Sequence, residues 1–186
     1  MSDKISAIGT IAAQPASGSF TITADNTVSY PYFQFTVTLD AAQIPVTDAG
    51  ASGSYGSLKL FDFNEGGIAF IASRQNYTAY SPDGTGVPND TVFDIGVGTA
   101  AIAAAADGVL TASATYDNIG AKVDQTLSSG TTTGTGFDFA GVAVDGTTTA
   151  ADMVLNWSGT AATVDGDGTI DVTGTITVAG VFLGDD

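Results

Sequence analysis

The sequence predicts an all-β protein: an antiparallel β-sandwich, jelly-roll-like, with about nine or ten strands and at most one short helix. Residues that favour strands (Thr, Val, Ile, Phe and Tyr) are plentiful, whereas Glu65 is the only glutamate and Lys and Arg together number 4. The chain also has 24 Gly, and Asp-Gly pairs separate short runs in which apolar and polar residues alternate. Such alternation indicates half-buried strands, and Asp-Gly is typical of tight turns.

The expected strands follow one another along the whole chain. In "YFQFTVTL" (32–39) every second residue is apolar, which puts Phe33 and Phe35 on one face. "SLKLFDF" (57–63) and "GIAFIAS" (67–73) form an apolar hairpin that should fill the core. The full set of expected strands is 19–24, 32–39, 57–63, 67–73, 91–98, 108–116, 137–144, 151–157 and 169–183, the last as one long or two short strands.

Two segments each admit two interpretations. "TAAIAAAADG" (99–108) is rich in Ala, which favours a short helical turn, but it lacks charge pairs and fits a loop equally well. Residues 1–17 form either an N-terminal arm that adds to a partner's sheet or a first strand within their own fold. Residues 18–186 then form a single β-sandwich domain, as expected for this length. The apolar stretch 5–13 is broken by Ser6, Gly9 and Thr10, so an unprocessed chain is expected.

Composition argues against several function classes. The chain has no His and no Cys, which removes the commonest general base, thiolate ligands and disulfides. The formal net charge is -16, and such a chain should repel nucleic acid and anionic membranes. We therefore expect no enzyme activity, no cofactor, no nucleic-acid partner and no membrane partner.

The best motif match for a binding site is "DGDGTID" (165–171). Asp165, Asp167 and Asp171 are spaced as at the start of a calcium loop. However, Thr169 replaces an acidic ligand and Ile176 stands where a bidentate Glu is needed. The two Asp-Gly pairs also suit a hairpin turn, which is the favoured interpretation. No metal ligand is assigned, and the sequence leaves open whether this turn binds a cation.

Two further residues have a chemical and a structural interpretation. Lys59 in "SLKLF" is either a desolvated reactive lysine or an outward-facing residue that pairs with Asp62, and we favour the second. Trp157 lies in a strand pattern with Val154 and Leu155, which favours core or interface packing over sugar stacking. No catalytic residue is assigned.

Four motifs occur in a characteristic order: "GSLKLFDFNEGGIAFIAS", "FDIGVGTAAIAAAADGVLT", "VAVDGTTTAADMVLNW" and "GTITVAGVFLGDD". This succession resembles a group of tailed-phage virion structural proteins of the β-sandwich capsid decoration (cement) type. The resemblance covers about residues 54–186, with 125–136 less alike.

The resemblance implies a structural role in the virion. The implied protein binds the outside of the phage head as an oligomer, a trimer or a dimer, and bridges subunits of the major capsid protein. It would be made in the host cytoplasm and located on the capsid exterior. The resemblance brings no catalytic or ligand-binding residues. Apart from the resemblance, surplus apolar residues such as Tyr77, Tyr80 and Phe182 are expected in an oligomer interface.

Two other functions fit the same pattern less well. A secreted or surface carbohydrate-binding or adhesin β-sandwich module would share the strands and the acidic charge. A glycoside hydrolase would need two carboxyl groups beside an aromatic cleft, and the sequence singles out no such pair.

Overall fold

The structure is a computed structural model that describes residues 8–25, 30–50, 53–82, 86–88, 92–103, 110, 115–127, 134–138, 142–159 and 164–184. Within these residues the chain forms eleven β-strands and no helix. The predicted all-β class is thus confirmed. The strands are β1 (Gly9–Ile11), β2 (Ser19–Ala24), β3 (Tyr32–Asp48), β4 (Ser54–Phe63), β5 (Gly67–Tyr80), β6 (Val92–Gly98), β7 (Gly120–Thr126), β8 (Gly134–Asp138), β9 (Val142–Val144), β10 (Asp152–Gly159) and β11 (Gly168–Gly184).

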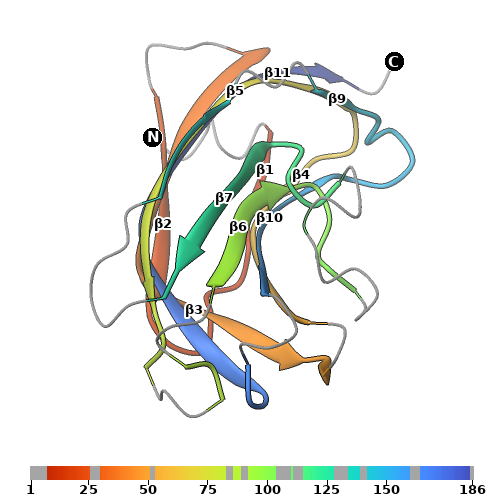
Figure 1. Ribbon diagram of the computed structural model, residues 1–186. Coiled ribbons are helices and arrows are strands. Elements are labelled where there is room, and N and C mark those ends of the chain that lie inside the picture. The colour runs from red at the N-terminus through yellow and green to blue at the C-terminus, as the bar shows by residue number, and fades with distance from the viewer. Residues whose placement is uncertain are drawn as a thin grey trace.

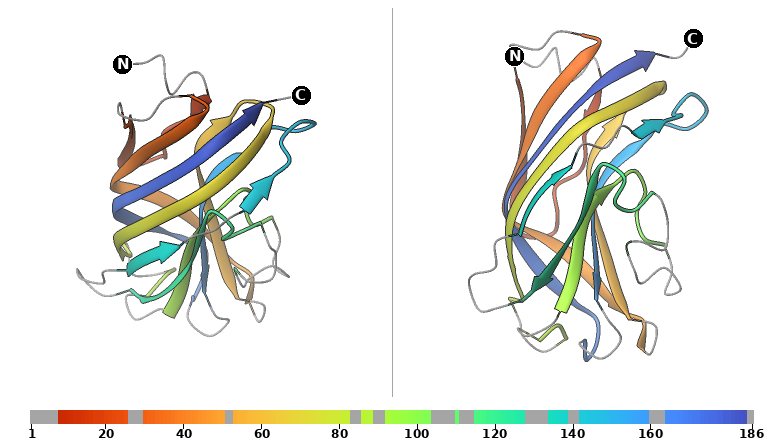
Figure 2. Two further views of the ribbon diagram at one scale, coloured as in Figure 1. Left: turned by 90° about the horizontal axis from the view of Figure 1, so that it is seen from above. Right: turned by 45° about the horizontal axis from the view of Figure 1, so that its top comes forward.

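All these strands belong to one antiparallel sheet. Its hydrogen-bonded order is β7-β6-β10-β4-β3-β11-β5-β8, while β1, β2 and β9 pair with β4, β3 and β5. Figures 1 and 2 show the sheet strongly curled, so that a wall of β2, β3, β11 and β5 faces a wall of β4, β10, β6 and β7. The two facing layers are therefore halves of a single half-barrel sheet.

Bulges in two long strands bend the sheet into this shape. Along β3 and β11 the register shifts between Val172 and Gly174, where Ala41 has a positive φ of 46°. The side chain of Thr173 accepts a hydrogen bond from the backbone N–H of Ala41 at 3.0 Å. A Cβ at Gly174 would collide with the backbone oxygen of Asn76, so this close strand approach requires glycine. Such bulges let one strand turn the corner between two layers.

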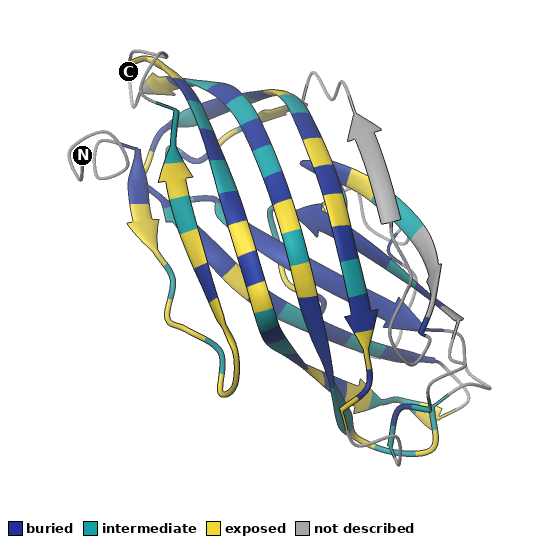
Figure 3. Cartoon of the chain, turned by 90° about the vertical axis from the view of Figure 1, so that its left-hand side faces the viewer, coloured by how far each residue is buried: buried dark blue, intermediate teal, exposed yellow. Residues whose placement is uncertain are grey.

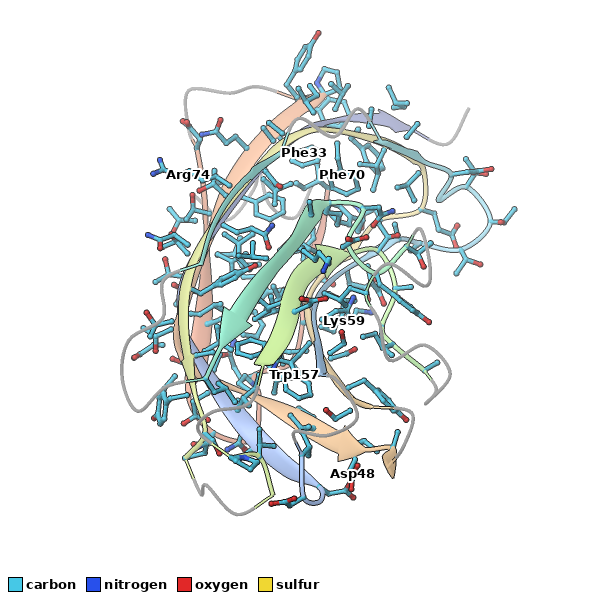
Figure 4. The ribbon with its side chains drawn as sticks, viewed as in Figure 1. Phe33, Asp48, Lys59, Phe70, Arg74 and Trp157 are labelled. Carbon is cyan, nitrogen blue, oxygen red and sulfur yellow. The ribbon has the colours of Figure 1, made fainter. Side chains whose placement is uncertain are left out.

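The core fills the space between the walls. The apolar face predicted for β3 is confirmed, because Phe33 and Phe35 are both buried. The ring of Phe63 lies 4.9 Å from that of Phe61 and 5.5 Å from that of Phe70, and it also contacts Phe33 and Phe35. Figure 4 shows Phe33 and Phe70 on the inner side of the curl. The apolar hairpin of β4 and β5 thus supplies much of the core, as predicted.

Trp157 fills the other end of the same core. It is fully buried on β10 and stacks on Phe93 of β6, with ring centroids 5.7 Å apart. This confirms the packing interpretation of Trp157 over sugar stacking.

The two ambiguous segments are partly described. Residues 99–103 are irregular, and 104–109 lie outside the described residues. Of the segment 1–17, Gly9–Ile11 forms β1 and pairs with Phe61–Phe63 of β4 in the chain's own sheet, while residues 1–7 are not described. The strand expected at 108–116 falls mostly outside the described residues, and Thr115 and Tyr116 are not in a strand.

Candidate docking surface

The acidic turn at 165–171 does not gather its carboxylates. Asp167 Oδ1 accepts a hydrogen bond from the N–H of Asp48 at 2.8 Å, whereas Asp171 lies on β11, buried opposite Tyr80. The turn links β10 to β11, which are not neighbours in the sheet, so the hairpin interpretation was wrong. In the described part of the chain, no three acidic side chains are grouped in a way that could hold a metal ion.

Lys59 faces outward from β4, as favoured above. Its Nζ lies 3.1 Å from Asp62 Oδ2 and 2.7 Å from Asp152 Oδ1, with about two fifths of its side chain exposed. Partial burial lowers its pKa, but the hydrogen bonds and charges of the two aspartates outweigh this, and the net pKa is raised. Lys59 is therefore a charged surface residue, and its ammonium group is not a nucleophile at neutral pH.

The motifs behind the resemblance serve the scaffold. In "VAVDGTTTAAD", the N–H and hydroxyl of Thr147 both donate to Asp145 Oδ1, which closes a local turn. The carbonyl of Gly146 accepts a hydrogen bond from Gly66 N–H at 3.0 Å, so this turn binds the tip of the β4–β5 hairpin. Two motifs that are distant in sequence are thus partners in the fold.

Asn156 is a key residue that sequence reasoning missed. It is fully buried on β10, and its Nδ2 donates to the carbonyls of Ala100 at 2.9 Å and Tyr116 at 2.8 Å. Its Oδ1 accepts from the hydroxyl of Ser57, which in turn accepts from Ile102 N–H. Asn156 thereby fixes the described start of the Ala-rich segment, residues 99–103, against the outside of β4 and β10. The sequence feature that could have identified Asn156 is its amide side chain within the otherwise apolar run "MVLNW".

Two residues expected in an oligomer interface belong to the core instead. Tyr77 and Phe182 are both buried, so that expectation was wrong for them, whereas Tyr80 is partly exposed. The Tyr77 hydroxyl donates to Gln75 Oε1, and Gln75 Nε2 donates to Ala121 O at 2.9 Å. These bonds connect β5 with β7 across the interior. A Cβ at Gly120 would lie 2.5 Å from Gln75 Nε2, so glycine makes room for this link.

Tyr77 should make the protein sensitive to alkali. Burial raises its pKa above the ordinary value of about 10, so the folded state keeps the proton that the unfolded state loses. The contribution of this raised pKa to the free energy of unfolding is therefore complete below about pH 10. Above that pH the contribution falls, by up to about 1.4 kcal/mol per pH unit. We expect Tyr77→Phe to flatten this fall in urea titrations between about pH 10 and 12. Tyr32→Phe, at an exposed ring, is the control, and an unchanged slope in Tyr77→Phe would contradict the assignment.

A recess of ≈ 340 Å³ lies beneath the connection between β1 and β2. Its lining includes Ala12, Pro15, Pro45 and Lys59, and no carboxylate among the described residues lines it. It thus lacks the acid pair that a glycoside hydrolase requires.

The outside of the wall of β2, β3, β11 and β5 carries an ordered polar array. Its two rows are set by strand register: Thr21, Thr38, Thr175 and Asn76 form one, and Thr23, Thr36, Thr177 and Arg74 the other. We call these eight residues the threonine face. Figure 3 shows this wall face-on, with buried and exposed positions alternating along its strands. Arg74 supplies the only charge among the eight.

One end of the same wall is apolar. Tyr30, Tyr32 and Leu183 are 62%, 58% and 58% exposed, and Tyr32 is the register partner of Val181. The ring of Tyr30 also contacts that of Phe182, with centroids 6.4 Å apart. We call Tyr30, Tyr32 and Leu183 the apolar end. Exposed aromatic residues of this kind are enriched in protein interfaces.

Among the described residues, no helix is long and apolar enough to cross a membrane. No family model matches the chain, and no curated protein is significantly similar to it.

Proposed function

We propose that this protein is a structural component of a phage virion that decorates the outside of the head and bridges subunits of the major capsid protein. The observation that carries the proposal is the apolar end, where three large side chains are exposed on a chain of net charge -16. Exposed apolar side chains that cluster at one place mark a docking site for another protein.

The distribution of charge supports the same role. Among the described residues, Asp48, Glu65, Asp145, Asp165 and Asp167 lie at strand ends or in the turns between strands. The apolar end and the threonine face contain no acidic residue, so these surfaces can approach a partner with the least electrostatic repulsion. Meanwhile the net charge disfavours binding to DNA, which suits a protein on the exterior of the head.

The order of the four sequence motifs is a second support. They supply the β4–β5 hairpin, β6, β9–β10 and the end of β11, and they contact one another through scaffold hydrogen bonds. The proposed role needs such a stiff framework and assigns no catalysis to any residue.

Stabilisation of the head would follow from the thermodynamic linkage between binding of this protein and assembly of the shell. A protein that binds the assembled shell but not its separate subunits shifts the equilibrium toward the shell. Repeated weak contacts around the shell, made by a dimer or a trimer, would give avidity beyond that of a single contact.

The test uses heads assembled without this protein. We expect the purified chain to co-sediment with such heads and to raise the temperature at which they release DNA. The triple variant Tyr30→Ser, Tyr32→Ser, Leu183→Ser should weaken binding at least about tenfold, since each loses a desolvated contact. Ile11→Ser, at an exposed apolar residue on β1, is the matched control. Undiminished binding by the triple variant would remove the apolar end from the proposal, and no binding by the native chain would remove the proposal itself.

A carbohydrate-binding module is the second candidate, favoured by the same exposed Tyr30 and Tyr32, because tyrosine rings can stack on sugars. A glycan array distinguishes the two functions. Binding to a defined glycan that is lost in the triple variant, without binding to heads, would establish this alternative.

A further inference from the structure

The threonine face combines features that suit contact with a second copy of this chain. Its threonines are short, and the hydroxyls of Thr36 and Thr177 hydrogen-bond to each other at 2.9 Å. Hydroxyls that are already paired lose little when water is removed. None of the eight residues is acidic and Arg74 is positive, so this part of the wall repels a second chain of net charge -16 less than the acidic turns do.

Two charged side chains at this wall make no ion pair with any residue that the structure describes. Arg74 projects away from the wall (Figure 4), and it makes no ion pair with any described residue. Asp40, exposed on β3, has none either. The register places Arg74 and Asp40 two strands and two rows apart. The usual spacing between strands and rise per residue make their separation about 16 Å, so the two side chains cannot reach each other within one chain.

We propose that two copies of this chain associate through the threonine faces around a two-fold axis that passes over Thr175. Thr175 lies midway between Arg74 and Asp40 in the register. In a contact of this symmetry, residue i of one copy faces residue j of the other and the reverse. Arg74 of each copy then pairs with Asp40 of its partner, and the long arginine spans the gap that the short threonines leave.

The shape of the wall sets the expected strength. Figure 1 shows the four strands nearly superposed and bent along their length, so the outer face of the wall is convex. Two convex faces meet only along a narrow strip, which we call the belt. Such a contact falls in the class of small, weak interfaces, for which we expect a Kd of about 10–100 µM. The apolar end lies outside this belt and stays accessible to the capsid. The contact supplies the oligomer of the proposed function, but its test needs no capsid.

The test is sedimentation equilibrium of the purified chain up to about 1 mM at about 0.15 M salt, where long-range repulsion is screened. We expect a monomer–dimer equilibrium, with the Kd raised at least about tenfold in Arg74→Glu and in Asp40→Lys. The double variant Arg74→Glu, Asp40→Lys exchanges the charges and should restore the native Kd.

Glu65→Lys is the matched control, because it changes the net charge by the same amount as Asp40→Lys at an exposed turn. If general repulsion alone governed association, both lysine variants would dimerise more tightly than the native chain. Our proposal requires that Asp40→Lys weaken the dimer while Glu65→Lys does not. A native chain that stays monomeric at 1 mM, or a double variant that stays as weak as the single ones, overturns the proposal and leaves capsid binding by the monomer unaffected. Unchanged far-UV spectra confirm that the variants are folded.

Discussion

Phe63→Ala should lower the free energy of unfolding by about 3–5 kcal/mol, as for other large aromatic residues removed from a core. The Phe63 ring contacts four other phenylalanine rings, from β3, β4 and β5. Alanine would leave a cavity at the junction of the two walls, and the long strands there cannot easily collapse to fill it. Since domains are stable by about 5–15 kcal/mol, this single change removes much of the total. Urea unfolding followed by the fluorescence of buried Trp157 gives the measurement.

Tyr32→Ala is the matched control for this loss, because it removes an aromatic ring that is 58% exposed from the same sheet. We expect it to change stability by no more than about 0.5 kcal/mol. Equal losses in the two variants would mean that the phenylalanine cluster is not the centre of the core.

Asn156→Leu should cost about 2–4 kcal/mol, although leucine is similar in size and more apolar. The substitution leaves the carbonyls of Ala100 and Tyr116 and the hydroxyl of Ser57 without their partner. Each buried polar group that loses its hydrogen bond costs about 1–3 kcal/mol. The loss should also release residues 99–103, so limited proteolysis should cut the chain there faster than in the native protein.

Asn76→Leu tests the same exchange at an exposed position on β5 and should be nearly neutral. A fully stable Asn156→Leu chain, with native resistance to proteolysis, would show that Asn156 does not hold the segment in place.

Local pattern was sufficient to predict the strands with strong alternation. The first half of β3 has apolar residues at every second position, and the hairpin of β4 and β5 has dense apolar runs on both sides of its turn; in both, the predicted core residues are buried. β7 was not predicted, because "GAKVDQT" has one large apolar residue and no clear alternation. Its place in the sheet depends on pairing with β6, a contact that no local pattern reveals.

The division of the sheet into walls could not be derived from the sequence either. A bend made by a bulge depends on the register between β3 and β11, which are separated by more than a hundred residues. The same limit explains Tyr77 and Phe182, which looked like surplus apolar residues. They are buried because the curled sheet has a deep interior, and a flat sheet would have left one of its faces to solvent.

The surfaces proposed for docking were also invisible before the fold was known. The threonine face joins "TIT" at 21–23, "TVT" at 36–38 and "TIT" at 175–177, three similar segments that only strand pairing brings into line. In the sequence each one reads as an ordinary exposed strand face.

The most direct test of the central proposal is an electron cryomicroscopy map of heads assembled without this protein and then mixed with it. The proposal predicts new density on the outer surface of the shell, repeated with the symmetry of the capsid, in which the apolar end contacts the major capsid protein. Heads that stay bare at saturating protein concentration, or density confined to the tail, would contradict it.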